Sequence, residues 1–263
     1  MSRRPGFPAR LDLQAGKPVA IKSVATGART TGTAGPKSIE TQPGGHGLDS
    51  QAVRERMVRK LAAQGVADTA VLAAMGAVER HRFVDSALVN QAYEDTSLPI
   101  GLGQTISKPN VVARMMELLL GGQRDPQGRL GRVLEIGTGC GYQAAVLARV
   151  ANEVYSIERL RGLHDKARDN LRPLRLANVH LLFGDGMAGF AKGAPYAGII
   201  AAAGGESIPQ AWVEQLAVGG RIVAPMVSAG GKQALVVLEK TTREVKQTVL
   251  EAVHFVPLKS GIA

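Results

Sequence analysis

Apolar and polar positions follow two different periods along this chain. Short apolar runs of strand length recur after residue 131, at 132–137, 153–158, 179–184, 197–203, 219–225, 233–240 and 248–256. Between them lie segments whose apolar positions are three or four residues apart, at 141–150, 160–176 and 209–217. This alternation predicts a doubly wound α/β sheet of seven strands, mainly parallel, with helices on both faces. Because the last three runs have little helix between them, we expect an antiparallel edge.

Helical spacing also appears before the first of these strands. Residues 50–62 carry apolar side chains at helical spacing. A second helix is expected over 69–78, directly after Asp68, a residue type that caps helices. A third is expected over 110–120, with Pro109 suited to its first turn. These helices must pack on the outside of the sheet or over its cleft.

Residues 1–48 differ from the rest of the chain. They contain eight glycines and five prolines without a sustained period, so they cannot bury enough apolar surface to offset the entropy cost of ordering. We therefore expect a disordered basic tail at 1–48 and one folded domain at 49–263, with helices and a long loop at 49–130 and the sheet core at 131–263. No secretory signal is recognisable near the first arginines, so a cytoplasmic protein is expected.

The amino-acid composition limits which classes of partner are expected. Hydrophobic residues make up 45% of the chain, yet no apolar stretch approaches the roughly 18 residues that cross a bilayer, so no membrane partner is expected. The net charge is +10, and residues 1–48 hold seven Lys/Arg against two Asp/Glu. A basic surface can attract nucleic acid, but a solubilising tail accounts for this charge, and we expect a monomer without a nucleic-acid partner. The chain has one cysteine, Cys140, and five scattered histidines, so no metal site is expected.

The first predicted strand leads into three glycines at alternate positions, Gly137, Gly139 and Gly141. Missing side chains let backbone N–H groups approach a ligand, and the N-terminus of the following helix adds partial positive charge. A dinucleotide-binding fold would have its third glycine where this chain has Tyr142, which disfavours NAD. Glu135 lies just before the glycines and suits a ligand that carries positive charge. The pattern E-x-G-x-G-x-G resembles the first motif of S-adenosylmethionine-dependent methyltransferases, which have Rossmann-like sheets.

Two further strand ends carry acidic residues at the same predicted edge, where open α/β sheets bind ligands. Glu158 lies 21 residues after Gly137, a distance at which a carboxylate can accept hydrogen bonds from both ribose hydroxyls. The alternative is a solvated carboxylate at a helix start. Asp185 could bind an exocyclic adenine amine, although Gly184-Asp185-Gly186 is also an ordinary turn. The fourth run lacks the Asn/Asp-Pro-Pro-aromatic cluster typical of amino-methylating nucleic-acid enzymes.

The stretch 92–109 is the most unusual in the chain. It is neither helical nor cleanly alternating, and its apolar residues argue against disorder, so we expect a long functional loop. The stretch is similar to the signature loop of protein-L-isoaspartate O-methyltransferases, A-Y-x-D-x-x-L-P-I-G-x-G-Q-T-I-S-x-P. The resemblance covers roughly residues 51–260 and includes matches at 134–143, 157–159, 184–186, 208–209, 215–216, 219–221 and 253–258.

The resemblance implies methyl transfer from S-adenosylmethionine to the α-carboxyl of L-isoaspartyl residues in damaged proteins or peptides. The ester then cyclises to a succinimide, whose hydrolysis returns some normal aspartyl. A carboxyl with a pKa of about 4 is ionised at neutral pH, so the reaction needs alignment and exclusion of water more than a general base.

The family's motif matches also imply roles for single residues. Ser107 is the implied catalytic residue, which positions the acceptor carboxylate, and its alternative role is to cap the following helix. The implied cofactor contacts are Glu135, Gly137, Thr138, Gly139, Gly141, Tyr142, Glu158, Arg159, Asp185 and Gly186. The implied substrate contacts are Gln104, Thr105, Ile106, His254 and Val256. Asp95 is expected to shape its turn, and Cys140 to be a small residue in a tight loop.

The chain departs from the family pattern at a few positions. Cys140 stands where serine is common, His254 where arginine is frequent, and residues 78–85 carry two changes in a V-P-R-H and F-V-P pattern. None removes a residue that the reaction needs. Two other functions are left open. A nicotinamide oxidoreductase is disfavoured by Tyr142 and by the lack of a proton-relay residue after the fourth strand. A cofactor-binding protein without activity would use its tail and basic charge for a protein or nucleic-acid partner.

Overall fold

The computed structural model describes residues 51–227 and 231–263. The predicted disordered tail, 1–48, lies outside the described residues. Within the described ranges no helix is long and apolar enough to cross a membrane. The same ranges contain no group of three or more His, Cys, Asp or Glu side chains that could hold a metal ion.

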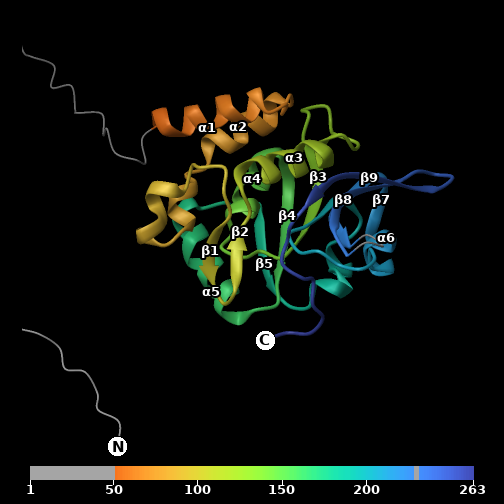
Figure 1. Ribbon diagram of the computed structural model, residues 1–263. Coiled ribbons are helices and arrows are strands. Elements are labelled where there is room, and N and C mark those ends of the chain that lie inside the picture. Colours follow the sequence, from red (N-terminus) through yellow and green to blue (C-terminus); the bar gives the residue numbers. More distant parts are fainter. Residues whose placement is uncertain (1–50, 228–230) are drawn as a thin grey trace, which may run out of the picture. The chain divides into compact units, whose positions relative to one another are not determined.

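A seven-stranded sheet with the order β5-β4-β3-β6-β7-β8-β9 forms the centre of the domain (Figure 1). Its strands are β3 Leu130–Ile136, β4 Ala151–Glu158, β5 Val179–Phe183, β6 Tyr196–Ala201, β7 Leu216–Val227, β8 Gln233–Lys240 and β9 Val245–Val253. The pairs from β5 to β7 are parallel, and β8 pairs antiparallel with both β7 and β9. The prediction of a mainly parallel, doubly wound sheet with an antiparallel edge is confirmed.

Helices cover the sheet in the order that the apolar periods predict. They are α1 Gln51–Ala63, α2 Thr69–Ala77, α3 Pro109–Leu120, α4 Tyr142–Val150, α5 Arg161–Leu171 and α6 Gln210–Gln215. Short 3₁₀ turns complete the chain at Arg80–Phe83, Ser86–Gln91, Arg172–Leu174, Gly186–Ala188 and Ala191–Gly193. The Asp68 side chain accepts hydrogen bonds from Ala70 N and Val71 N, which confirms the predicted cap of the second helix.

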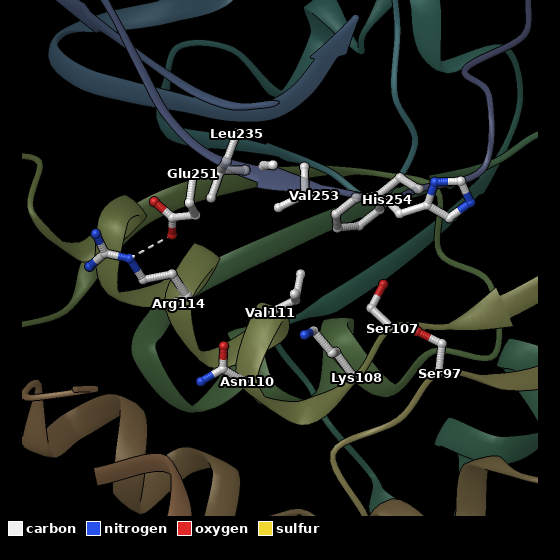
Figure 2. A pocket seen from close by; sticks show the side chains of 12 residues that line it. Ser97, Ser107, Lys108, Asn110, Val111, Arg114, Leu235, Glu251, Val253 and His254 are labelled. Atoms are coloured by element: carbon white, nitrogen blue, oxygen red, sulfur yellow. Dashed lines mark hydrogen bonds and ion pairs between the residues drawn. The ribbon is translucent and has the colours of Figure 1, made fainter. Parts of the chain in front are cut away.

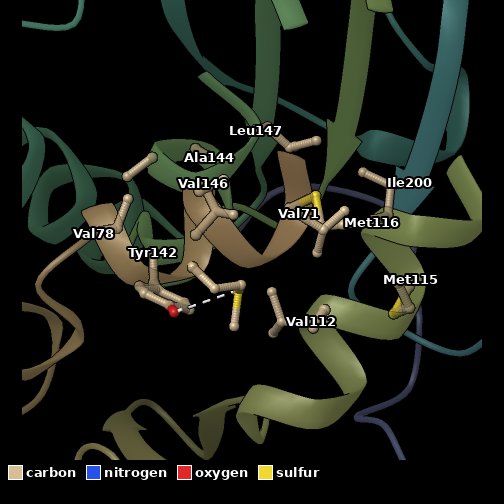
Figure 3. Close-up of a cluster of buried hydrophobic side chains, with 14 of the residues drawn as sticks. Val71, Val78, Val112, Met115, Met116, Tyr142, Ala144, Val146, Leu147 and Ile200 are labelled. Carbon is tan, nitrogen blue, oxygen red and sulfur yellow. Dashed lines mark hydrogen bonds between the residues drawn. The ribbon is translucent and has the colours of Figure 1, made fainter. Parts of the chain in front are cut away.

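The sheet separates two apolar clusters because neighbouring residues of a strand face opposite sides. Val133 and Ile200 belong to the larger cluster, which also contains the apolar faces of α1 to α4 (Figure 3). Leu134 and Ile199 belong to the smaller cluster, which packs against Trp212 of α6. The first two helices, α1 and α2, therefore pack outside the sheet on α3 and α4. This is one of the two positions that the sequence allowed.

The stretch 92–109 is not entirely irregular, which corrects the prediction of a long loop. It contains a two-stranded antiparallel sheet formed by β1 Leu98–Gly101 and β2 Gln104–Ile106. Leu98 and Ile100 are buried while Pro99 and Gly101 are exposed. This alternation is only four residues long. It also contains a proline and a glycine, two residue types that are rare in strands, so the sequence gives little indication of a strand here.

Candidate functional site

The loop after β3 makes the turn that the glycine pattern predicts. Gly137, Gly139 and Gly141 have φ angles of 91°, 57° and 89°, a region that residues with side chains rarely adopt. At Gly141 an added Cβ would also lie only 3.0 Å from Leu171 Cδ1. The turn leads directly into the N-terminus of α4, where free backbone N–H groups favour anionic or polar ligand groups.

Glu158, at the carboxyl end of β4, reaches from its strand to this turn. Its Oε2 accepts a hydrogen bond from Gly139 N at 2.9 Å, and its Oε1 accepts one from Leu160 N at 2.9 Å. The residue is only 5% exposed, so both bonds are shielded from water. Each carboxylate oxygen keeps further acceptor capacity, which suits the predicted contact with two hydroxyl groups.

Beneath the turn, buried polar side chains form a chain of hydrogen bonds. Thr138 Oγ1 and Ser156 Oγ lie 2.6 Å apart, and the Ser156 hydroxyl donates to Glu135 Oε2. Burial raises the pKa of Glu135 to about 8, against the opposing effects of Ser156 and Gln143. Among the described residues, Glu135 Oε1 and Gln143 Nε2 are buried without a hydrogen-bond partner. Unpartnered buried polar atoms are costly. Of these two residues only Gln143 borders a cavity, so its amide is the group that a ligand can reach.

A cavity of about 450 Å³ opens beside the glycine turn. Five of the predicted cofactor residues line it: Gly137, Gly139, Glu158, Arg159 and Gly186. A smaller space of about 40 Å³ shares Gly137 and Gly139 with it and is bordered by Thr138, Tyr142 and Gln143. We call the two spaces together the glycine-turn cavity. Glu135 lines neither of them, so it lies under the floor of the cavity and acts through Ser156 and Thr138.

Two of the predicted cofactor residues contact the end of the chain. Arg159 Nε donates to Gly261 O at 2.8 Å, and Gly261 N donates to Asp185 Oδ2 at 2.6 Å. The other Asp185 oxygen accepts from Met187 N at 2.9 Å. Asp185 is not one of the residues that line the glycine-turn cavity, and its contact with an adenine amine stays a prediction.

Tyr142 borders the small space but extends into the core (Figure 3). It is 1% exposed, and its hydroxyl lies 3.8 Å from Met75 Sδ. Any ligand contact of Tyr142 therefore comes from its backbone or ring edge. Cys140 is buried as well, and burial raises the pKa of its thiol. A buried neutral thiol is a poor nucleophile, in agreement with its expected role as a small residue.

Ser107 follows β2, and its backbone is held by a buried cation. Arg80 is fully buried and donates to Ser107 O at 2.7 Å and to Ala92 O at 2.8 Å. The same guanidinium carbon lies 4.8 Å from the centre of the Tyr142 ring. Within the part of the chain that the structure describes, the Ser107 hydroxyl has no hydrogen-bond partner. Its backbone is thus held in place while its side chain is available to a ligand.

The alternative role of Ser107, capping the next helix, is wrong. Lys108 occupies the N-cap position of α3 and makes no side-chain cap hydrogen bond. The cap is supplied by Asp95 instead, whose Oδ1 accepts a hydrogen bond from Asn110 N at 2.9 Å. Asp95 therefore shapes the turn, as the sequence analysis expects.

A second cavity, of about 440 Å³, lies on the other side of Ser107 (Figure 2). We call it the Ser107 cavity. It is lined by Ser97, Ser107, Lys108, Asn110, Val111, Arg114, Leu235, Glu251, Ala252, Val253, His254 and Phe255. Ser107 also borders the glycine-turn cavity. The two cavities therefore meet at this one hydroxyl, which Figure 2 shows pointing toward the segment that carries Val253 and His254.

The structure distributes the predicted substrate contacts differently from the sequence analysis. Only Ser107 and His254 line the Ser107 cavity. Gln104, Thr105, Ile106 and Val256 line the glycine-turn cavity instead. The reason is that β1 and β2 and the segment after β9 fold back across the glycine turn, so these residues face the predicted cofactor side.

Sequence reasoning missed three contributors to the site. Arg80 stands between Glu79 and His81 and two residues before Arg82, so no local signal marks it as the buried arginine. The amide of Gln143 is part of the glycine motif, and its lack of a partner becomes visible only in three dimensions. Lys108 carries no signal because the signature loop leaves its position open.

Comparison with known proteins now decides the family. The model of the family described as protein-L-isoaspartate(D-aspartate) O-methyltransferase matches residues 52–263. The chain belongs to this family. A protein-L-isoaspartate O-methyltransferase from Methylibium petroleiphilum is 64% identical over 223 residues, which cover 84% of this chain and 82% of that protein. Another from Burkholderia thailandensis is 52% identical over 251 residues, covering 94% of this chain and 75% of its relative, so that alignment reaches into residues 1–48.

Solved structures of the same family share the fold. One protein-L-isoaspartate O-methyltransferase superposes with a TM-score of 0.71 and 29% identity, covering 80% of this chain and 67% of its own. A putative family member from Plasmodium falciparum, solved in complex with S-adenosyl-L-homocysteine, superposes with a TM-score of 0.66 and 21% identity over 78% of this chain and 98% of its own. In this protein-L-isoaspartate O-methyltransferase chain, Ser107 at the end of the family's loop motif thus borders the same small space as Gly137 and Gly139 of the glycine motif.

Proposed function

We propose that this chain transfers a methyl group from S-adenosylmethionine to the α-carboxyl of L-isoaspartyl residues in damaged proteins. The single observation that carries the proposal is the position of Ser107, which borders both the glycine-turn cavity and the Ser107 cavity. Ser107 is the residue that lines both the small space beside the glycine turn and the Ser107 cavity, so donor and acceptor groups in the two cavities can approach each other beside it. Family membership and the names of the relatives support the same reaction.

The residues of the glycine-turn cavity fit S-adenosylmethionine. The buried carboxylate of Glu158 provides acceptors for ribose hydroxyls, and the backbone of Gly137 and Gly139 permits close approach. The unpartnered amide of Gln143 supplies a buried donor at the small space. Glu135, beneath the turn, contributes acidic character that favours a cationic ligand once ionised. When bound, the cofactor supplies a methyl group on a sulphonium, and the electron pair of the broken C–S bond stays on sulphur.

On the acceptor side the protein has to position a nucleophile that already exists. An isoaspartyl carboxylate is ionised at neutral pH, so no residue needs to remove a proton. The Ser107 hydroxyl donates a hydrogen bond to one carboxylate oxygen and leaves the other oxygen free to form the new C–O bond. Arg80 holds the Ser107 carbonyl at 2.7 Å, which fixes the direction of that hydroxyl. Such alignment can lower a barrier by about 7–11 kcal/mol.

The ester product leaves with no charge on the methylated carboxyl. The neighbouring backbone nitrogen then attacks the ester carbonyl and expels methanol, which closes a succinimide ring. Hydrolysis of that ring returns part of the material as normal aspartyl. The protein is needed only for the first step.

The decisive experiment compares two peptides that differ only in having an isoaspartyl or a normal aspartyl residue. Labelled S-adenosylmethionine should transfer its methyl group to the isoaspartyl peptide only, and the label should be released as methanol in mild base. Equal labelling of the two peptides, or none, would contradict the proposed function. Calorimetry with S-adenosylhomocysteine separates a loss of cofactor binding from a loss of transfer.

Finer features belong to the same proposal. A monomer without nucleic-acid or membrane partners is part of the proposal. Sedimentation at several protein concentrations tests it. A cytoplasmic location is supported by the single, buried cysteine, since disulfides are the feature typical of oxidising compartments. Cell fractionation tests that location.

The alternative of a cofactor-binding protein without activity is not favoured. Its support came from the departures at Cys140, His254 and residues 78–85. The structure places Cys140 in the core, His254 on the wall of a cavity, and the two changed residues of 78–85, Glu79 and Asp85, in ion pairs with Arg54 and Lys166. None of these departures fills either cavity or displaces the Ser107 hydroxyl.

A further inference from the structure

The Ser107 cavity carries more positive charge than its own residues neutralise. At its far end Arg114 Nε and Glu251 Oε1 lie 3.0 Å apart, the pair joined by a dashed line in Figure 2. The same guanidinium also contacts Glu117 Oε2 at 3.0 Å. Two carboxylates therefore share one arginine, and this end of the cavity has no surplus of positive charge.

Lys108 is the cation that remains. It is half-buried, lines the cavity directly beside Ser107, and its ammonium group has no hydrogen bond or ion pair with any residue in the described ranges. The nearby carboxylate of Asp95 is directed to Asn110 N, at 2.9 Å, and makes no ion pair with Lys108. An ammonium in this position is available to a carboxylate that enters the cavity.

The start of α3 adds to the same positive potential. Lys108 is the N-cap residue, and its side chain satisfies none of the N–H groups of the first turn. Asp95 satisfies only the N–H of Asn110. Pro109 has no N–H, and Val112 N donates to Lys108 O at 3.2 Å. The N–H of Val111 is therefore the one left in the first turn, and together with the helix dipole it favours negative charge at this end. The ammonium and the helix start thus act in the same direction at the Ser107 end of the cavity.

Lys108 is also a feature of this chain and not of the signature loop. In the pattern A-Y-x-D-x-x-L-P-I-G-x-G-Q-T-I-S-x-P the residue between serine and proline is left open, and Lys108 occupies that position. Because its backbone neighbours are held by Arg80 and Asp95, changes at this position can alter the charge of the cavity without moving Ser107.

We propose that Lys108 makes the enzyme prefer isoaspartyl sites that have an acidic residue next to them in the chain. The inference rests on the proposed function, because it assigns a substrate class to the same site. A peptide that presents its isoaspartyl carboxylate to Ser107 has its neighbouring side chain within the same 440 Å³ cavity. A carboxylate there pairs with Lys108, whereas a neutral amide of the same shape does not.

The test uses two matched pairs of isoaspartyl peptides. In one pair the residue before the isoaspartyl is Glu or Gln, and in the other pair the residue after it is Glu or Gln. With the full-length enzyme, kcat/KM for the Glu peptide should exceed that for the Gln peptide about two- to five-fold in at least one pair, the range of a partly exposed ion pair. Raising the salt concentration should bring this ratio toward one.

Variants assign the preference to the side chain. Lys108→Gln should reduce the Glu/Gln ratio to about one, and Lys108→Glu should invert it. The matched control is Lys60→Gln, which removes an exposed lysine from the end of α1 and should leave the ratio as in the unmodified enzyme. Thermal melting and S-adenosylhomocysteine binding show that each variant is folded.

The possible outcomes separate the two proposals. A wild-type ratio of one in both pairs, or a preference that persists in Lys108→Glu, overturns the role of Lys108 while the isoaspartyl specificity of the enzyme stands. An equal loss of kcat/KM for every peptide in Lys108→Gln also overturns it, because Lys108 would then act on the acceptor carboxylate itself. If the unmodified enzyme methylates no isoaspartyl peptide in preference to its aspartyl counterpart, the proposed function fails and the inference fails with it.

Discussion

The two cavities that meet at Ser107 are built in different ways. The glycine-turn cavity is made from regular elements, namely the ends of parallel strands, a glycine turn and a helix N-terminus. Its main polar group, Glu158, is already bonded to Gly139 N and Leu160 N. The Ser107 cavity lies between an irregular loop, α3 and the end of β9, and two of its polar side chains, Ser107 and Lys108, have no partner within the described residues.

The difference follows from what each cavity has to bind. A single cofactor of constant shape can be bound largely by backbone groups, whose geometry single substitutions hardly change. The acceptor cavity has to bind damaged proteins of many different sequences. Only the reacting carboxylate is common to all of them, so only this group can be bound by an invariant residue. In this chain the constant group is Ser107 on a braced backbone, and the neighbouring Lys108 can vary.

Removing the Ser107 hydroxyl should have the largest effect. A hydrogen bond to a charged group is worth about 1.5–3 kcal/mol, so Ser107→Ala should lower kcat/KM for an isoaspartyl peptide about ten- to hundred-fold. Binding of S-adenosylhomocysteine, measured by calorimetry, should stay nearly the same. Ser97→Ala changes another hydroxyl at the same cavity and should cost far less. A loss of cofactor binding in Ser107→Ala would show that Ser107 acts in the glycine-turn cavity and not on the acceptor carboxylate.

Glu158→Gln should affect cofactor binding in the glycine-turn cavity. The amide can still accept one hydrogen bond, but it lacks the charge that strengthens the bonds to ribose hydroxyls, so S-adenosylhomocysteine should bind about ten-fold more weakly. At saturating cofactor, kcat should change much less. Glu153→Gln is the matched control because Glu153 lies at the other end of β4 and pairs with Arg132. Unchanged affinity in Glu158→Gln would show that the carboxylate only braces the turn.

Arg80→Lys tests whether the loop must be held rigidly for turnover. An ammonium cannot bond both carbonyls as the planar guanidinium does, so the Ser107 backbone should lose one of its supports and kcat should fall about five- to ten-fold, an effect of misplacement. S-adenosylhomocysteine affinity should be retained. Arg82→Lys, on the exposed side of the same 3₁₀ turn, is the control. A lower melting temperature with unchanged kcat would make Arg80 a purely structural residue.

The smallest effect concerns the pH dependence of stability. The pKa of Glu135 is raised to about 8 in the folded protein from the ordinary glutamate value of 4.5, so the folded state keeps a proton that the unfolded chain loses. Stability should therefore be unaffected by this group at acidic pH, fall as the pH rises between these two values, and level off above pH 8. Glu135→Gln should remove this part of the decline. A kcal/mol corresponds to about 2–4 °C for a domain of this size.

Thermal melting from pH 5 to pH 9 measures the effect. The melting temperature of the unmodified protein should fall by several degrees relative to that of Glu135→Gln across this range, since burial is the main cause of the raised pKa. Glu153→Gln serves again as control, because the ion pair with Arg132 lowers the pKa of Glu153 and its carboxylate is ionised throughout. Parallel curves for the unmodified protein and Glu135→Gln would contradict the raised pKa.

The sequence by itself determined the sheet and the glycine turn. Strand length, helical spacing and the glycines at 137, 139 and 141 are local properties, because each depends on how a few neighbouring residues use backbone angles and bury one face. The antiparallel edge also followed, since the last three runs leave no room for a crossover helix. Element ends differ by a few residues, as at β9, where pairing with β8 sets the strand at Val245–Val253.

Only the tertiary structure decided how the acceptor side is assembled. The β1–β2 pair joins residues that are 3 to 8 positions apart, the cap from Asp95 to α3 spans 15 positions, and the support of Ser107 by Arg80 spans 27. The Ser107 cavity joins residues from α3 and β9 that lie even farther apart, as the bond between Arg114 and Glu251 shows. Such contacts have no local signature, because their energy depends on long-range packing and on which polar groups remain unpaired. For that reason the motif could name Ser107, but only the fold could show that its hydroxyl lies where two cavities meet.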